Sequence, residues 1–430
     1  MNYDIFEKII SLSKRRGFFY QSCDIYGGLN GIYDKGPFAC KLEENIKSAW
    51  IKDIYDSEYQ IIQIDGSILG HSMMWQASGH IDGFNDPMID CLECKARYRT
   101  DEINTTKACH KCGNKKWGEE KQFNMMFSTN VGPVKDSASI AFLRPETAQS
   151  IFSQFKNIIS TNRLKIPFGI MQIGKSFRNE ITPRQFLFRL REFSQMELEF
   201  FCKEENAINL FEYWKEKRFN FFKKIGFYES NIRFNDHKKE DLSHYSKATT
   251  DIECLLPFGW KEVEGIAYRT NFDLSAHTKF SGKELSIYDD EKKCSYIPHV
   301  VECSVGLERL MFAILCNAYH EDEINGEIRI VLKLNKNIAP YKAAIFPLTN
   351  NEIVLAKKIY KDISNKIDIQ YDESGSIGKR YRRQDEIGTP YCITIDQEGA
   401  LNNTVTIRHR DSTVQERIAI EKILEFLEKK

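Results

Sequence analysis

This sequence of 430 residues has no excess of charge of either sign and little that would take it to a membrane. No apolar run approaches the roughly 20 residues needed to cross a bilayer. Residues 1–10 include Asp4 and Glu7 and lack the apolar segment of a secretory signal. Lysine plus arginine and aspartate plus glutamate both number 61, so any nucleic-acid surface must be a local patch. We therefore expect a cytoplasmic protein without a membrane partner.

Length and apolar content predict two packed domains. Hydrophobic residues make up 42% of the chain, and 430 residues exceed the roughly 100–200 of one domain. A boundary is expected at residues 335–337, where a new alternation of strand and helix begins. The same patterns predict helices over 1–16, 206–225, 237–247, 351–365 and 413–428, and strands over 257–274, 343–348, 391–396 and 404–407.

The most informative stretch is FRNEITPRQFLFRLREFSQMELEFF, at residues 177–201. Its alternation places Met196, Leu198 and Phe200 on one face, with Glu197 and Glu199 on the other, which predicts an antiparallel hairpin around a polar loop. The arginine side chain grips phosphate through a planar fork and stacks on flat bases. The hairpin therefore suits a nucleoside triphosphate, although the stretch alone also fits a surface ladder of ion pairs.

Four of the twelve cysteines have the spacing of a metal site. Cys91 and Cys94 form one C-x-x-C pair, Cys109 and Cys112 form a second, and 14 residues lie between the two pairs. Two such pairs are typical of a zinc ribbon with four thiolate ligands. Because four protein ligands leave no open position, we predict a structural rather than catalytic zinc ion in an insertion over about 88–116.

The hairpin resembles motif 2 of the class II aminoacyl-tRNA synthetases. Residues 300–316 are similar to motif 3, in which a short strand leads into a helix that carries Arg309, and residues 33–50 are similar to motif 1, whose Pro37 would lie at a dimer interface. Three further segments, 143–152, 257–277 and 375–396, resemble the dimeric form of glycyl-tRNA synthetase. The resemblance extends over essentially the whole chain.

This resemblance implies an α+β fold and a reaction. Residues 1–334 would form a class II catalytic domain, with an antiparallel sheet flanked by helices and the zinc-ribbon-like insertion. Residues 335–430 would form a mixed α/β anticodon-binding domain. The implied protein is a homodimer that converts glycine and ATP, with Mg²⁺, to glycyl-adenylate and pyrophosphate, and then transfers glycine to the 3′ end of tRNA(Gly).

The resemblance also assigns the residues that handle ATP. Arg178 would hold the α-phosphate, and Glu180 would meet the adenine amino group or the tRNA end. Phe193 and Arg309 would cover the two faces of adenine. Arg189 would reach the γ-phosphate side, and Glu262 would act through Mg²⁺. Arg178, Glu180 and Arg309 form the catalytic set. The ATP-binding set is Arg178, Asn179, Glu180, Phe188, Arg189, Leu190, Arg191, Glu192, Phe193, Glu262, Val263, Gly306, Leu307, Glu308 and Arg309, with no individual role for Glu308.

Glycine recognition is implied to rest on carboxylates. Glu146, Glu197 and Glu302 would converge on the ammonium group, although Glu146 alone also fits the acidic start of a helix. Alanine must be rejected by lack of room, because one methyl group is worth only about 1 kcal/mol in attraction. The glycine-binding set is Arg99, Glu146, Phe193, Glu197, Arg269, Glu302, Ser304 and Gly306.

Two basic segments are candidates for RNA contact. Residues 379–383 combine four cations with Tyr381, and Arg408 and Arg410 flank His409. Cations beside an aromatic ring suit single-stranded RNA. The alternative is a basic turn paired with Asp385 and Glu386.

Two other functions remain open. A sister synthetase for proline, threonine or histidine would need a shaped side-chain pocket, against which the three glutamates argue. A catalytically inactive accessory subunit that binds nucleic acid would have lost the ATP residues Arg178, Phe193 and Arg309, all of which are present.

Overall fold

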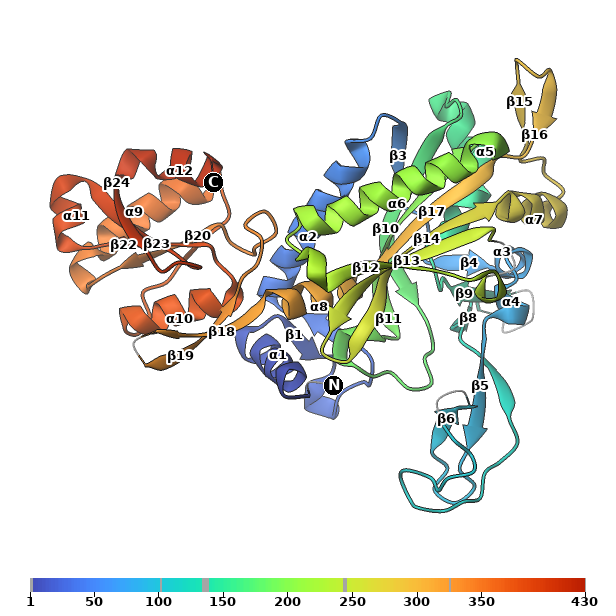
Figure 1. The fold of residues 1–430 in the computed structure, drawn as a ribbon, viewed down its shortest axis with the longest axis horizontal. Helices are drawn as coiled ribbons and strands as arrows, with labels where there is room; N and C mark the ends of the chain where they lie inside the picture. The colour runs from blue at the N-terminus through green and yellow to red at the C-terminus, as the bar shows by residue number, and fades with distance from the viewer. Residues whose placement is uncertain (1–2, 101–102, 134–138, 243–245, 325, 430) are drawn as a thin grey trace.

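The computed structural model describes residues 3–100, 103–133, 139–242, 246–324 and 326–429. Figure 1 shows a large N-terminal body built on a twisted sheet and a smaller C-terminal α/β body beside it. Within the described ranges, none of the helices combines the length and apolarity required to cross a bilayer.

A seven-stranded sheet organises the N-terminal body. Its strand order is β12-β13-β14-β17-β11-β10-β3, and every neighbouring pair is antiparallel except β10 with β3. The strands are β3 (Gln60–Ile64), β10 (Phe168–Phe177), β11 (Glu192–Cys202), β12 (Ile232–Asp236), β13 (Ala248–Leu256), β14 (Gly259–Thr270) and β17 (His299–Gly306). The predicted hairpin is the β10–β11 pair, in which Phe177 lies opposite Glu192.

Helices cover the two faces of this sheet unequally. The main apolar core lies on the face of Met196, Leu198 and Phe200, against α1 (Tyr3–Arg16), α2 (Pro37–Tyr55), α6 (Ala207–Lys224) and α8 (Leu307–Ala318). On the other face, α5 (Ala148–Asn162) and α7 (Phe272–Ser281) bury a smaller core around Phe201. The rest of that second face lines a cavity. Strand alternation therefore decides which side chains reach it.

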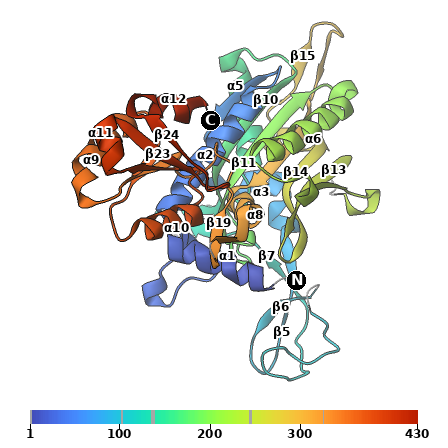
Figure 2. The ribbon, with the colours of Figure 1, turned by 60° about the vertical axis from the view of Figure 1, so that its left-hand side comes forward.

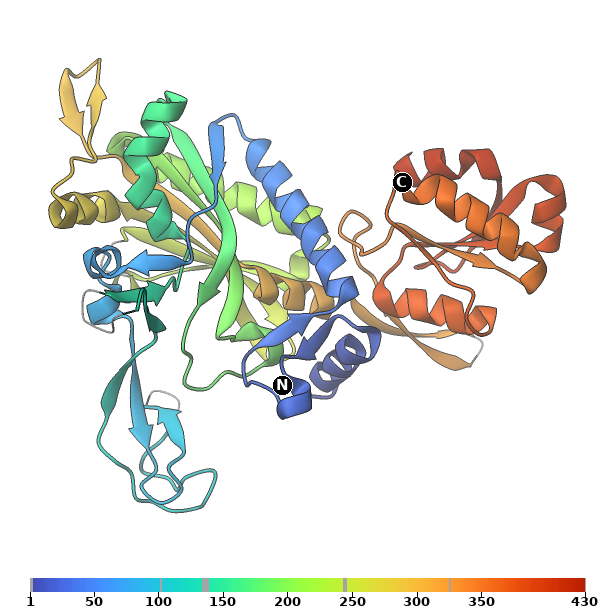
Figure 3. The same cartoon turned by 180° about the vertical axis from the view of Figure 1, so that it is seen from behind.

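Shorter elements surround the sheet. β1 (Phe19–Gln21) pairs with β2 (Tyr33–Lys35), and β15 (Ile287–Asp289) with β16 (Cys294–Tyr296). A three-stranded unit of β4 (Leu69–His71), β8 (Ser128–Asn130) and β9 (Ile140–Leu143) lies near α3 (Ser72–Ala77) and α4 (His80–Gly83). The cysteine-containing insertion is a second such unit of β5 (Asn85–Asp90), β6 (Arg97–Arg99) and β7 (Lys121–Asn124), which projects from the body in Figures 1 and 3.

The C-terminal body is a five-stranded sheet in the order β21-β20-β22-β23-β24. Its strands are β20 (Ala343–Pro347), β21 (Ile369–Tyr371), β22 (Tyr391–Ile395), β23 (Thr404–His409) and β24 (Gln415–Ala419), of which the first three are parallel. Its helices are α9 (Ile353–Ser364), α10 (Ile377–Ile387), α11 (Gln397–Asn402) and α12 (Ile423–Lys429). A hairpin of β18 (Tyr319–Ile324) and β19 (Glu327–Leu332) precedes it, and α10 lies near α1 in Figure 2.

Three secondary-structure predictions were wrong. The helix expected over 413–428 is replaced in its first part by the edge strand β24, because residues 415–419 pair with β23. The helix expected over 237–247 contains only a short 3-10 turn at Lys239–Asp241, and residues 243–245 lie outside the described ranges. The strands expected over 257–274 end at Thr270, and α7 begins at Phe272.

Candidate active site

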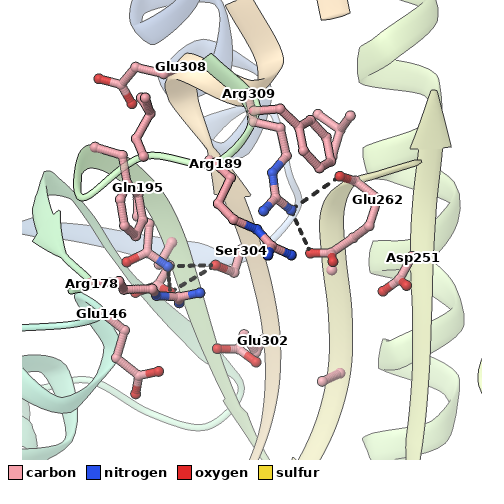
Figure 4. Close-up of a pocket in the computed structure, with 18 of the residues that line it drawn as sticks. Glu146, Arg178, Arg189, Gln195, Asp251, Glu262, Glu302, Ser304, Glu308 and Arg309 are labelled. Carbon is pink, nitrogen blue, oxygen red and sulfur yellow. Dashed lines mark hydrogen bonds and ion pairs between the residues drawn. The ribbon is translucent and has the colours of Figure 1, made fainter. Parts of the chain in front are cut away.

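A cavity of about 500 Å³ opens on the second face of the sheet, over β11, β14 and β17. Seventeen of the predicted ATP and glycine residues line it. They are Arg99, Glu146, Arg178, Glu180, Phe188, Arg189, Leu190, Phe193, Glu197, Glu262, Val263, Arg269, Glu302, Ser304, Gly306, Glu308 and Arg309. Side chains that are far apart in the sequence therefore meet in one place, with Glu146 and Glu302 at one end and Arg309 and Glu262 at the other (Figure 4).

Four predicted ATP residues lie outside this lining. The Arg191 guanidinium donates to the carbonyl oxygens of Glu180 and Asn30. Glu192 forms an ion pair with Lys175 at 3.0 Å. The backbone N–H of Asn179 donates to the Met125 carbonyl oxygen, and the Leu307 side chain is fully buried in the main core. Arg191 and Asn179 therefore brace the motif 2 loop instead of facing the cavity.

The acidic end of the cavity is built around Glu197, which is 1% exposed. Its carboxylate accepts hydrogen bonds from the Thr147 backbone N–H at 3.0 Å, from the Ser304 hydroxyl at 2.8 Å and from the Gln195 amide at 3.0 Å. Burial, followed by the charges of Glu146 and Glu302, raises the pKa of Glu197 to about 7. The group is thus held in place and lacks a cationic partner among the hydrogen bonds and ion pairs of the described residues.

Glu302 and Glu146 flank this carboxylate. Glu302 accepts from Arg269 at 3.0 Å, and Arg269 is held in turn by both oxygens of Asp273 at 2.8 Å. Burial raises the pKa of Glu302, while Arg269 opposes that shift. Burial also disfavours the ionised form of Glu146, but His80, 3.4 Å away, and then Arg269 outweigh it and lower its pKa. Three carboxylates thus meet at this end of the cavity, and Glu197 forms no ion pair within the described residues, so this end suits a small cationic group.

The other end presents arginines and rings. The Arg178 guanidinium lies 5.3 Å from the centre of the Phe193 ring, and the Arg309 guanidinium lies 4.5 Å from the Phe188 ring. Arg309 also pairs with Glu262 at 3.2 Å. Burial raises the pKa of Glu180, although Arg189 and Arg178 oppose the shift. Cations that stack on rings and face a polar cavity can bind phosphates and a flat base.

Sequence reasoning missed eight residues of the lining: Met125, Leu187, Gln195, His237, Thr249, Asp251, Gly265 and Ala267. Gln195 could have been found, because it shares the alternation of Phe193 and Glu197 on β11. His237 and Asp251 come from the edge of the sheet, where they bond to each other at 2.8 Å. Their position depends on the pairing of β12 with β13, for which the sequence carries no clear signal.

The four predicted metal ligands converge. The Sγ atoms of Cys91, Cys94, Cys109 and Cys112 all lie within 4.8 Å of one another. Two of the separations are 3.6 Å and 3.8 Å. A tetrahedron with Zn–S bonds of about 2.3 Å has edges of about 3.8 Å, so these thiols fit a zinc ion.

The two basic segments are mostly occupied within the C-terminal body. Arg380 is buried on α10 and donates to the backbone oxygens of Gly375 and Pro347. Arg408 is buried and holds both oxygens of Asp385, at 2.9 Å and 3.0 Å. Arg383 pairs with Asp372. Arg408 thus pairs with Asp385 as the alternative predicted, while Arg380 and Arg383 are held by backbone oxygens and by Asp372, so for these arginines the structure supports internal contacts over RNA contact.

Two known protein families match this chain. The family described as "tRNA synthetase class II core domain (G, H, P, S and T)" matches residues 134–318, and the family described as "Anticodon binding domain" matches residues 342–430. Together with the sheet and its cavity, these matches define a class II aminoacyl-tRNA synthetase.

Curated relatives narrow the class further. The chain is 47% identical to the glycine–tRNA ligase of Caldanaerobacter subterraneus subsp. tengcongensis, with 99% of this chain and 98% of the relative covered. It is 48% identical to the glycine–tRNA ligase of Borrelia garinii subsp. bavariensis (98% and 96% covered), and 46% identical to that of Clostridium tetani (99% and 98% covered). The chain belongs to the glycine–tRNA ligase family, whose members are ATP-dependent ligases.

Proposed function

We propose that the cavity activates glycine with ATP to give glycyl-adenylate and pyrophosphate, and then passes glycine to the 3′ end of tRNA(Gly). The observation that carries this proposal is the convergence of Glu146, Glu197 and Glu302 at one end of a cavity whose other end holds arginines and rings. The acids suit an ammonium group, and the cations suit the phosphates of ATP.

The residues at the two ends of the cavity have separate roles in the first step, the formation of glycyl-adenylate. Glu146, Glu197 and Glu302 surround the glycine ammonium, with Ser304 and Arg269 keeping Glu197 and Glu302 in place. A glycine carboxylate oxygen attacks the α-phosphorus of ATP, and the bond to pyrophosphate breaks. Arg178 stabilises the charge on the α-phosphate, and Phe193 and Arg309 hold adenine between them. No general base is needed, because the attacking carboxylate is already ionised.

Two metal ions belong to the proposal. Glu262 offers a half-exposed carboxylate at the ATP end, a ligand type that Mg²⁺ prefers, and Mg²⁺ there would neutralise phosphate charge. The four cysteines of the insertion would hold a structural Zn²⁺, supported by the fit of their separations to a tetrahedron.

We also propose that two copies of the chain form a homodimer through the segment that resembles motif 1, in which Pro37 begins α2. A cytoplasmic location is supported by the twelve cysteines, none of which forms a disulfide, as suits a reducing compartment.

The decisive experiment is ATP–pyrophosphate exchange with each of the twenty amino acids in turn, without tRNA. Exchange with glycine alone supports the reaction and the substrate together. Exchange with another amino acid would overturn the glutamate pocket, and no exchange at all would favour a role in RNA binding without catalysis. Arg178→Ala should abolish exchange without changing the circular dichroism of the protein.

A further inference from the structure

At the junction between β17 and α8, the Glu308 side chain accepts the hydrogen bond of a β11 backbone N–H that has no carbonyl partner on β17. The β11–β17 ladder ends with Gln195 opposite Gly306, where the chain turns into the helix. The next N–H along β11, that of Ser194, donates to Glu308 Oε2 at 2.7 Å. The Ser194 hydroxyl donates to Glu308 Oε1 at 3.3 Å. A side chain of the helix thus extends the strand ladder by one residue.

This carboxylate is neutralised from a third segment. Lys35, at the end of β2, lies 2.7 Å from Glu308 and 2.7 Å from Glu43 of α2. The side chains of these three residues are at most 14% exposed. Burial lowers the pKa of Lys35, but Glu308 and Glu43 outweigh it, so the net shift is upward and the ammonium is retained. A buried ion pair with hydrogen bonds at both ends holds its members firmly in place.

The residues next to this cluster are those assigned to adenine. Phe193 immediately precedes Ser194, and Arg309 immediately follows Glu308. A first-turn acid would by itself only favour the start of a helix. That role requires neither Ser194 nor Lys35, so the cluster does more than begin α8.

We propose that Glu308 is a positioning residue that fixes Phe193 and Arg309 relative to each other. Lys35 holds the Glu308 side chain in place and ties it to the segment before α2. The proposal rests on the ATP site described above. Glu308 does not contact ATP in this proposal. It acts by holding the backbone on either side of the adenine.

The test is equilibrium binding of ATP, measured by calorimetry without an amino acid, together with the KM values for ATP and glycine in pyrophosphate exchange. Glu308→Gln keeps an acceptor for Ser194 but loses the ion pair with Lys35. We expect ATP binding to weaken about tenfold, the loss of one charge-assisted hydrogen bond, while the KM for glycine changes less than twofold. Lys35→Met should weaken ATP binding similarly, and Lys35→Arg should restore it.

Glu264→Gln is the matched control. Glu264 is a fully buried carboxylate of β14 that pairs with Arg218 at 2.6 Å and does not line the cavity. Its variant should lose stability without losing ATP affinity. If Glu308→Gln and Glu264→Gln weaken ATP binding equally, Glu308 has only a structural role. The same conclusion follows if Glu308→Gln changes the KM for ATP and the KM for glycine by the same factor.

The two proposals can fail separately. Because ATP binding is measured without glycine, a wild-type protein that shows no exchange would refute the proposed function and leave the test of Glu308 intact. If Glu308→Gln does not fold, the contrast between Lys35→Met and Lys35→Arg decides the question. Equal ATP affinity in those two variants would overturn the role of the cluster.

Discussion

At the scale of single residues, the Glu197 carboxylate at the glycine end of the cavity forms no ion pair among the residues that the structure describes. Glu197 is held by Thr147, Ser304 and Gln195, which donate hydrogen bonds without carrying charge. An ammonium group would supply the missing cation. Binding of glycine should therefore compete with binding of a proton to this carboxylate.

The pKa of Glu197, raised to about 7 by burial and then by Glu146 and Glu302, makes this competition measurable. Below pH 7 the carboxyl is protonated and attracts an ammonium poorly. We expect the KM for glycine to fall as pH rises from 6 to 8, while the KM for ATP stays nearly constant. Glu197→Gln should raise the KM for glycine and remove most of its pH dependence. A wild-type KM for glycine that is flat over this range would contradict the assignment.

Glu199 presents the opposite case, a buried acid without a partner. It is fully buried, and neither carboxylate oxygen has a hydrogen-bond partner within the part of the chain that the structure describes. Burial, and then the charge of Glu302 directly across the ladder, raises its pKa well above the usual value. We therefore expect the folded protein to favour the protonated form of Glu199.

Protonation of Glu199 predicts a pH-dependent stability. The folded-state pKa exceeds the unfolded value of about 4.3, so the folded chain binds the extra proton. The stabilisation that the extra proton contributes is complete below the unfolded-state pKa. It is lost as pH rises toward the folded-state pKa, by up to about 1.4 kcal/mol per pH unit. The free energy of unfolding of Glu199→Gln, relative to wild type, should increase from pH 5 to pH 8 in urea titrations. A constant difference would show that Glu199 is ionised in the folded state.

At the scale of elements, the insertion depends on its cysteines more than on its core. Its few buried residues include Met88, Ile89, Cys91 and Cys109. One of its strands also carries Arg99, which pairs with Asp86 at 2.7 Å and lines the cavity. Disorder in the insertion would therefore reach the active site through Arg99.

We expect purified protein to contain about one zinc ion per chain by elemental analysis. Cys94→Ser should lose the metal and exchange amide hydrogens rapidly within the insertion, while the seven-stranded sheet stays protected. Arg99→Ala should reproduce any change in the KM for glycine that Cys94→Ser causes, without loss of zinc. A zinc-free Cys94→Ser protein with a fully protected insertion would make the metal dispensable.

Elements with a strong alternation of apolar and polar residues could be predicted from the sequence. Elements whose structure depends on pairing with a distant strand could not. The β10–β11 hairpin was confirmed, because Met196, Leu198 and Phe200 must face a core while Glu197 must not. The cysteine cluster also follows from spacing alone. Strand β24 was missed because its pattern resembles a helix until β23 offers a partner. Arg380 and Arg408 look like RNA ligands in sequence, because the backbone oxygens that hold Arg380 leave no mark in the sequence and Asp385 lies 23 positions from Arg408.

At the scale of the whole molecule, ion pairs join the two bodies. Arg15 and Arg16 of α1 both reach Glu386 of α10, which is 5% exposed. Arg329 of β19 contacts Asp385 at 3.3 Å. These contacts lie far from the cavity but fix where the C-terminal body stands relative to it.

Glu386→Ala should loosen this connection and leave adenylate formation intact. Because the variant strands two cations at an interface, we expect a loss of about 1–3 kcal/mol, seen in calorimetry as earlier unfolding of the C-terminal body. Aminoacylation of tRNA should fall more than pyrophosphate exchange, which needs no tRNA. Glu229→Ala, which breaks the exposed pair with Lys223, is the control. Equal losses in both assays would place the effect in the catalytic body itself.

Strand β11 has one more consequence for substrate choice. It carries Phe193 at the adenine end and Glu197 at the ammonium end, four residues apart and on the same face. At about 3.3 Å per residue, the extended backbone separates positions 193 and 197, and therefore the sites for adenine and the ammonium group, by about 13 Å. Substitutions at position 197 can therefore alter which amino acid is accepted without moving ATP. Inserting or deleting one residue between these positions would reverse the alternation, so that the Glu197 side chain would face the core, and activity would be lost.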